Sequence, residues 1–447
     1  MTETLSRALS PAGHAVRSPA TAAHFPASAP APSGPAGLTT SRGAALYIGA
    51  LLGPGLLLLP GLAAAEAGPA SVLAWAGLLV LSGLFAIVFG SLGRGFPSAG
   101  GIIGYVRAGL GERASAVAGW SFLAGVVAGA PVVCLIGAGY VTELTGGGRL
   151  TRALIGTLLL LAVMALAAGG LRASATAQLL LVGLLLAVVV IAVAGSAGSS
   201  HASNWTPFAP HGWPAIGHAA STLMLSFVGW EAVAPLTTRF TDPARQLPRV
   251  IGIALAVTSV LYLGLAIATI SVLGTGAGIS APLAALLRDA AGPAGTAAAA
   301  VAAVVLTLGA VNAYVTGAAE MAAELTRRTD APAGPVTRPA PRFLAAIGAS
   351  GLAVISLYGL GLVSPAALIA IPTTLFLVVY LGCMTSAARV LRGPARLAAA
   401  PAAVIVALVL AFCGWALVGA LVVAVAVCSA RPLGRAGAVM RKSRVSR

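Results

Sequence analysis

The stretch Leu46–Gly61 reads LYIGALLGPGLLLLPG, and it decides the fold because a strongly apolar helix is interrupted in its middle. A second stretch, Leu223–Phe240, reads LMLSFVGWEAVAPLTTRF and has the same organisation. Irregular backbone inside a bilayer leaves N–H and C=O groups without helical partners, so it survives only when buried in protein or lining a polar cavity. Two interruptions at corresponding positions of two halves are typical of a transporter's substrate site.

The composition sets the class of protein. Of 447 residues, 59% are hydrophobic and 8% are charged, and the mean hydropathy is +0.99. A soluble domain of this size does not keep so little charge on its surface, so we expect an all-α polytopic membrane protein. Apolar runs of roughly 20 residues predict twelve transmembrane helices, at residues 44–66, 70–92, 116–142, 153–169, 175–196, 214–238, 250–274, 295–325, 343–361, 364–388, 397–413 and 415–430.

The net charge is +16, and the basic residues that produce it are distributed unevenly among the loops. When loops are assigned alternately to the two sides, every Lys and Arg falls on the N-terminal side except Arg149, Arg152 and Arg288. Because basic residues concentrate in cytoplasmic loops, both termini are predicted to be cytoplasmic. We therefore expect the basic surface to meet anionic lipid headgroups and no nucleic acid.

The chain divides into two tails and one membrane domain. Residues 1–40 are rich in Ala, Pro and Ser and have no apolar core, which predicts a disordered cytoplasmic tail. Residues 431–447 are rich in Arg and predict a short basic cytoplasmic tail. The membrane transporter domain is expected at residues 41–430.

Within that domain, the first ten spans form two sets of five, at about 44–196 and about 214–388. Because five is odd, the second set begins on the opposite side of the membrane, and equivalent helices run in opposite directions. This is the inverted 5+5 repeat, with helices 1 and 6 broken. Residues 397–430 add two extra helices.

The first interruption contains Gly53, Pro54 and Gly55. Glycine allows backbone angles closed to other residues, and proline removes an N–H donor. After the break, the amides of Gly55 and Leu56 are expected to open a half-helix whose positive N-terminus suits a carboxylate. A proline kink without a binding role is the alternative.

The second interruption contains Phe227, Gly229, Trp230 and Glu231. A carboxylate in the middle of a span is costly and indicates a functional site. Three roles fit Glu231: a proton site for coupling, a contact for a substrate ammonium group, or a structural acceptor for the N–H groups of the broken backbone. Phe227 and Trp230 either line a side-chain pocket or pack as ordinary apolar residues.

Asn312 and Thr316 lie one turn apart in the eighth predicted span. They either line the cavity or join helices by hydrogen bonds. The sequence contains no hydrolase motif, phosphate-binding loop or metal-binding spacing, so we predict no enzyme activity, no catalytic residue, no metal site and no cofactor.

Three motifs occur together in the chain. They are GALLGPGLLLLPGLAA in span 1, LGRGFPSAGGIIGYVRAGLG after span 2 and FVGWEAVAPLTTRFTDPARQLPRVI in span 6. In combination, they resemble the amino acid–polyamine–organocation (APC) superfamily of transporters over residues 44–430. Within it, the chain looks most like the bacterial branch of methionine and branched-chain amino acid exporters, which implies a bacterial inner (plasma) membrane.

The resemblance implies a LeuT-like fold. It also implies that a substrate carboxylate meets the first break at Gly53–Gly55, while the amine meets carbonyl groups near Phe227–Gly229. Pro54 stands where this superfamily usually has a small residue with an N–H, so one carboxylate donor is missing.

The function expected from these observations is secondary active transport of a small, apolar amino acid by alternating access. Coupling to protons or sodium and a monomeric or homodimeric state are both compatible with the sequence. Two alternatives stay open, a transport-inactive sensor or scaffold on the same fold, which Pro54 favours, and a transporter of a related amine or organic cation.

Overall fold

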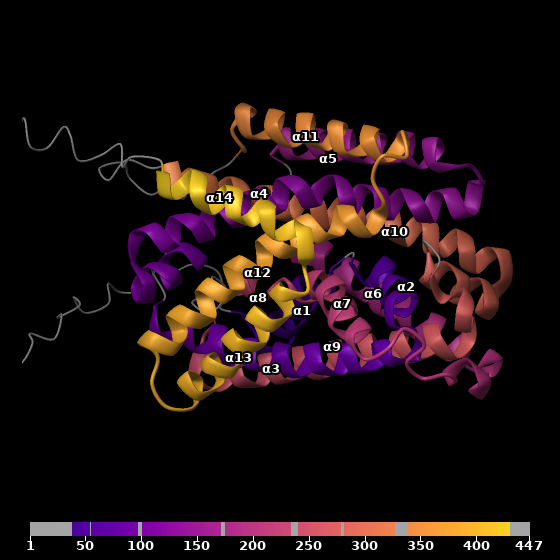
Figure 1. Ribbon diagram of the computed structural model, residues 1–447, viewed down its shortest axis with the longest axis horizontal. Helices are drawn as coiled ribbons and strands as arrows, with labels where there is room; N and C mark the ends of the chain where they lie inside the picture. Colours follow the sequence, from indigo (N-terminus) through magenta and orange to yellow (C-terminus); the bar gives the residue numbers. More distant parts are fainter. Residues whose placement is uncertain are drawn as a thin grey trace, which may run out of the picture. The chain divides into compact units, whose positions relative to one another are not determined.

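The computed structural model describes residues 38–53, 55–96, 101–170, 175–233, 240–278, 281–326 and 338–429, and these are almost entirely helical (Figure 1). Pro54, most of the first predicted tail and the whole of the second lie outside this part. The α-helices are α1 (Thr40–Leu51), α2 (Gly55–Ala67), α3 (Ser71–Gly95), α4 (Ile102–Thr145), α5 (Arg149–Ala168), α6 (Ala175–Gly195), α7 (Pro214–Leu223), α8 (Trp230–Val233), α9 (Pro243–Ala268), α10 (Pro282–Thr326), α11 (Pro341–Gly359), α12 (Pro365–Val390), α13 (Pro394–Ala411) and α14 (Leu417–Ser429).

Each of the predicted spans overlaps one or more of these helices. Among the described residues, 8 helical segments are long and apolar enough to cross a membrane. This number is lower than the predicted number of spans for three reasons. Predicted span 6 is divided into short pieces, α2 and α3 count as one segment, and two further apolar helices, Leu179–Gly195 and Gly414–Ser429, are shorter. The fold is that of a polytopic helical membrane protein.

The outer helices expose apolar side chains at helical spacing. On α5, the exposed residues are Leu150, Leu154, Leu158 and Leu161. A spacing of three and four residues places them on one face of the helix. Such a continuous apolar face is unsuited to water and suited to lipid.

The centre of the bundle is held by close helix crossings at small residues. On α4, a β-carbon at Gly137 would lie 2.4 Å from Thr307 Oγ1 on α10. A β-carbon at Gly109, near the start of α4, would lie 2.7 Å from the carbonyl oxygen of Ser386 on α12. Membrane helices pack closely through such small residues because no hydrophobic effect drives them together.

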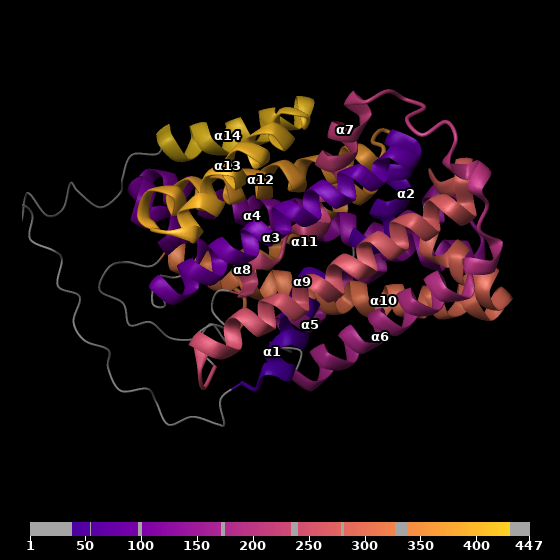
Figure 2. The same cartoon turned by 90° about the horizontal axis from the view of Figure 1, so that it is seen from below.

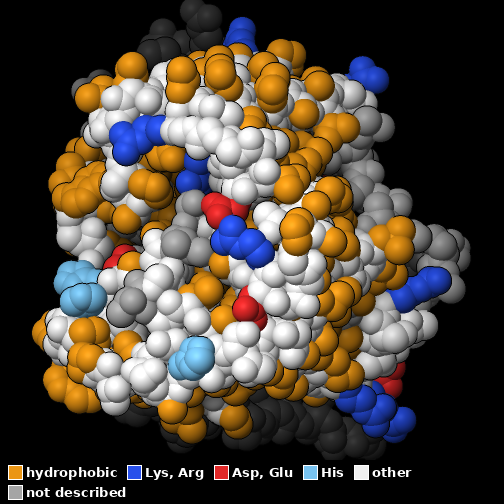
Figure 3. Space-filling model, turned by 90° about the vertical axis from the view of Figure 1, so that its right-hand side faces the viewer, with side chains coloured by type: hydrophobic (Ala, Val, Ile, Leu, Met, Phe, Trp, Pro, Cys, Tyr) orange, Lys and Arg blue, Asp and Glu red, His pale blue; other side chains and the backbone are white. Residues whose placement is uncertain are grey.

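The remaining helices surround this centre. Helices α5 and α11 lie side by side (Figure 1) and contact each other. Figure 2 shows α13 and α14 along one edge and α6 along the opposite one. The end-on view in Figure 3 shows charged and histidine side chains both near the middle of the face and at its margins, with large areas of apolar side chains between them. This distribution fits a bundle whose sides meet lipid and whose end meets water.

The crossing of α4 and α10 gives a test of the packing. Gly137→Val would force its side chain into Thr307, and such overpacking costs about 1–3 kcal/mol. We expect the melting temperature of the purified protein to fall by several degrees. Gly77→Val on α3, where a β-carbon meets no atom within 4 Å, is the matched control and is expected to change it little. Equal melting temperatures for the two variants would contradict this packing.

Candidate functional site

The first break separates α1 from α2. Helix α1 ends at Leu51, and Leu52 leaves the helical region with φ −80° and ψ 76°. Helix α2 begins at Gly55. The amide of Leu56 donates to the carbonyl oxygen of Gly53 at 3.2 Å, so it is not the free donor that the sequence predicted. Pro54 lies outside the described residues, and its part in the break stays a prediction.

The second break lies between α7 and α8. Helix α7 continues into a short 3₁₀ helix, η4 (Met224–Phe227), and Val228 is then extended with ψ 131°. Gly229 has φ 147°, a conformation that side chains disfavour. Helix α8 starts at Trp230. The chain is therefore interrupted at both of the places that the sequence predicted.

Side chains replace the missing helical partners at the second break. The carboxylate Oε2 of Glu231 accepts from the amide of Gly229 at 2.9 Å and from the hydroxyl of Tyr380 on α12. That hydroxyl oxygen accepts from the amides of Gly229 at 3.0 Å and Trp230 at 3.2 Å. Glu231 thus has the contacts of a structural acceptor, one of its three predicted roles, and the other two stay predictions.

A single hydroxyl group joins the two breaks. The hydroxyl of Tyr262 on α9 donates to two backbone carbonyl groups. Its oxygen lies 2.8 Å from the carbonyl oxygen of Leu51 and 2.7 Å from that of Ser226. The breaks also touch directly, because a β-carbon at Gly55 would lie 2.9 Å from Ser226 Oγ. Interrupted backbone from both halves of the chain therefore meets at one place.

Aromatic rings surround this place. Trp75 of α3 lies 5.8 Å from Phe227 and 5.1 Å from Tyr262, measured between ring centroids, and Phe227 lies 5.2 Å from Tyr262. Trp230 is fully buried and donates from Nε1 to Ser82 Oγ at 2.8 Å. Phe227 therefore forms part of an aromatic cluster at the breaks, whereas Trp230 is anchored to α3.

Most described side chains at the breaks are buried, and Gly53 is partly exposed. The exposed fractions of Leu56, Phe227 and Trp230 are 0%, 2% and 0%. Three buried polar atoms close to the breaks have no hydrogen-bond partner among the described residues, namely Ser226 Oγ, Trp75 Nε1 and Glu231 Oε1. Buried polar atoms without partners are costly and mark places where another molecule can bind.

The two polar residues predicted in the eighth span lie on α10. Asn312 is buried. The hydroxyl of Thr316 donates to the backbone carbonyl oxygens of Asn312 and Ala313, one turn earlier. That hydroxyl is therefore engaged within its own helix, and a cavity-lining role for the pair stays a prediction.

Sequence reasoning missed the residues that hold the breaks in place. These are Tyr262 and Tyr380, together with Trp75 and Ser82 of α3. A signal was present, because tyrosines of membrane proteins concentrate at the interfaces, whereas Tyr262 and Tyr380 lie in the middle of predicted spans. A tyrosine at that depth needs a hydrogen-bond partner for its hydroxyl.

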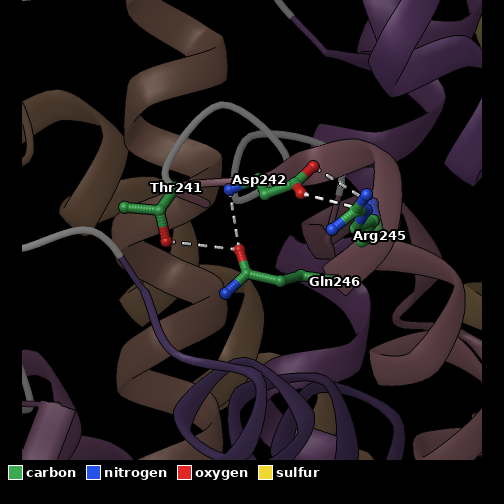
Figure 4. A network of polar contacts seen from close by, with 4 residues as sticks. All are labelled: Thr241, Asp242, Arg245 and Gln246. Atoms are coloured by element: carbon green, nitrogen blue, oxygen red, sulfur yellow. Dashed lines mark hydrogen bonds and ion pairs between the residues drawn. The ribbon is translucent and has the colours of Figure 1, made fainter.

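The segment after the second break is tied to the start of α1. Leu38 pairs with Phe240 in an isolated parallel bridge. Gln246 on α9 donates from Nε2 to the carbonyl oxygen of Leu38 at 3.4 Å, and its Oε1 accepts from the amide of Asp242 at 2.9 Å. Figure 4 shows the part of this network formed by Thr241, Asp242, Arg245 and Gln246, in which the side chain of Arg245 also lies against Asp242.

A family model for amino acid permeases matches residues 38–427, and the chain belongs to this family, within the APC superfamily. It is 31% identical over 397 residues to an uncharacterised amino acid permease of Bacillus subtilis, YecA, with 87% of this chain and 94% of the relative covered. It is 30% identical over 371 residues to the L-methionine/branched-chain amino acid exporter YjeH of Escherichia coli, with 79% and 86% covered.

A third relative is the branched-chain amino acid permease BcaP of Bacillus subtilis, 26% identical over 271 residues that cover 55% of this chain and 57% of the relative. These relatives are named as permeases and an exporter, not as enzymes. The predicted superfamily is thus confirmed, and the chain is a multi-pass membrane protein of an amino acid transporter family.

Tyr262→Phe tests the bridge between the breaks. It removes one donor from two buried carbonyl groups, which costs about 1–3 kcal/mol, and we expect a lower melting temperature. Tyr358→Phe on α11 is the control, because that hydroxyl makes no hydrogen bond to the described residues while its ring contacts Arg149 and Arg152. An unchanged melting temperature for Tyr262→Phe would refute the bridge.

Gln246→Ala tests the network in Figure 4. The variant loses the contacts of the side chain to Leu38 and Asp242, so we expect faster amide hydrogen exchange at residues 38–43 and 241–246. Arg249→Ala, an exposed position on the same helix, should leave the exchange rates unchanged. If both variants exchange like the native chain, Gln246 does not hold these segments together.

Proposed function

We propose that the chain is a secondary active transporter of amino acids with small apolar side chains, methionine and the branched-chain amino acids in particular, and that it works by alternating access with both termini in the cytoplasm. The meeting of the two breaks carries the proposal. Backbone polar groups from two halves of the chain converge there, beside buried polar atoms that lack protein partners among the described residues.

The surroundings support an apolar substrate side chain. Trp75 and Phe227 are buried aromatic residues beside the breaks. Glu231 is buried at the same break, and one of its carboxylate oxygens lacks a partner in the described part of the chain. An acidic substrate side chain would bring a further negative charge beside this carboxylate, and burying an uncompensated charge is costly. The name of the exporter relative supports the same substrate class.

The closed geometry supports alternating access. Because Leu56, Phe227 and Trp230 at the breaks are buried, a substrate that contacts these side chains requires the helices around them to move. The short pieces α1, α2, α7 and α8 are the elements that such a movement would reorient. The contacts of Leu38 with Phe240 and Gln246 join the start of α1 to the start of α9 at the end predicted to be cytoplasmic, and in the proposed mechanism they break when that side opens.

Counterflow in proteoliposomes tests this function. Radiolabelled L-leucine should accumulate when unlabelled L-methionine, leucine, isoleucine or valine is inside, and not when L-lysine or L-glutamate is inside. Gly55→Val would put its side chain against Ser226 and should reduce counterflow at least about tenfold, since a misplaced site loses most of its binding energy. Gly77→Val is the control.

Two results would count against the proposal. Equal counterflow by charged and apolar amino acids would reject the substrate class. A thermal shift with leucine but no counterflow would indicate the alternative, a transport-inactive sensor.

Glu231→Gln tests proton coupling. The amide oxygen of the substituted side chain still accepts hydrogen bonds, but the amide cannot exchange a proton as a carboxylate does. If Glu231 carries the coupling proton, uptake by the native chain should depend on a pH gradient, and the variant should keep counterflow but lose that dependence. An unchanged gradient dependence would leave Glu231 only its contacts to Gly229 and Tyr380.

A further inference from the structure

The structure contains a cavity away from the two breaks that has the size and the lining of a small-molecule binding site. This cavity, of about 300 Å³, lies between the last turn of α2, helix α7, the first turns of α12 and the connection from α13 to α14. This volume is at the lower end of small-molecule sites. It is separate from the meeting of the breaks, since none of the break residues lines it. It lies at the end of α2 that the charge distribution predicts to be external.

A carboxylate lines this cavity. Glu66 Oε1 accepts from the hydroxyl of Thr222 on α7 at 2.8 Å. Its other oxygen, Oε2, is buried and has no hydrogen-bond partner in the described part of the chain. The ion pairs found among the described residues join other acidic groups, and none includes Glu66. The carboxylate therefore has one oxygen bonded to Thr222 and a second, buried oxygen that lacks a partner among the described residues, and a ligand donor that reached this second oxygen would satisfy it.

Aromatic side chains form another part of the cavity lining. Phe412 packs edge-on against His218, with 5.3 Å between ring centroids, and Trp415 follows it in the connection. Phe412 is held close to α7, because a β-carbon at Gly217 would lie 2.5 Å from its ring. The cavity thus offers an apolar surface as well as a negative charge.

Hydroxyl groups complete the lining. Ser221 and Thr373 contribute side chains, and Ser364 is the N-cap of the 26-residue helix α12. The first turn of α12 lines the cavity too, and the N-terminus of a helix favours a negative group. A ligand with an ammonium group, an apolar side chain and a carboxylate can therefore satisfy all parts of this lining.

The geometry points to a second, external binding site for a zwitterionic amino acid with an apolar side chain, its ammonium group on Glu66 and its side chain against Phe412 and Trp415. The ligand class rests on the proposed function, and the location does not. Because α2 and α7 also carry the two breaks, an amino acid in this cavity contacts the same helices that hold the central site. Occupancy of one site is then linked to the state of the other.

The test is the stoichiometry of [³H]L-leucine binding to the full chain, in nanodiscs whose lipid headgroups carry no primary amine. We expect two leucine molecules per native chain at saturation, one for Glu66→Gln and one for Gly55→Val. The Glu66→Gln side chain retains an oxygen that can accept from Thr222, so the fold should survive. Glu143→Gln is the matched control, because Glu143 is an exposed carboxylate paired with Arg288 and should keep both molecules.

The ligand's groups are tested in Gly55→Val, in which only the external site should bind. There 3-methylbutylamine, which keeps the ammonium group, should displace leucine at least tenfold better than 4-methylpentanoate, which keeps only the carboxylate. One leucine per chain in both the native protein and Glu66→Gln would overturn the external site and leave the proposed function standing. Unchanged binding in Gly55→Val, with loss of all binding in Glu66→Gln, would overturn the central site instead.

Discussion

The structure depends on the pairing of backbone polar groups where two membrane helices are interrupted. An amide or carbonyl group in an apolar environment costs free energy unless it is hydrogen-bonded. Tyr262 meets this requirement for Leu51 and Ser226, and Tyr380 with Glu231 meets it for Gly229 and Trp230. These few contacts allow the chain to leave the helical conformation in the middle of the membrane domain.

The same contacts connect the two halves of the chain to the helices around them. Tyr262 belongs to α9 and Tyr380 to α12, while Trp230 is anchored to Ser82 on α3. The breaks are therefore held by helices that are themselves continuous through this depth. A short helical piece held at one end can change orientation while fewer backbone hydrogen bonds break than in a continuous helix. Transport by alternating access requires such a change of orientation.

The sequence allowed the helical class, the positions of the spans and both breaks to be predicted, because these follow from local signals. Long apolar runs predict spans, and Gly53, Gly55 and Gly229 mark the interruptions. The partners could not be predicted in this way, because Tyr262 and Tyr380 lie in other spans and are brought to the breaks only by tertiary packing. Leu56 illustrates the limit at shorter range, since its amide is engaged by Gly53 in a local turn.

The sequence indicated which carboxylate is unusual, but not the partners or the surroundings of the acidic side chains. A carboxylate in a predicted span marked Glu231 as unusual, but its bonds to Gly229 and Tyr380 depend on the fold. Glu66 lies at the predicted external end of span 1, a position that by itself indicates no more than a surface carboxylate. In the structure it lines a cavity that α7, α12 and the α13–α14 connection create together, and no feature of the sequence near Glu66 indicates this cavity.

The central claim is that interrupted backbone at the meeting of the two breaks binds the amino acid. An experimental structure of the chain with bound L-methionine tests this most directly, because the sulfur atom identifies the orientation of the ligand. We expect the carboxylate of methionine at residues 53–55, its ammonium group at the carbonyl oxygens of residues 226–229 and its side chain beside Trp75 and Phe227. Methionine bound elsewhere with both breaks empty, or continuous α-helix through residues 52–55 and 227–230, would contradict the account.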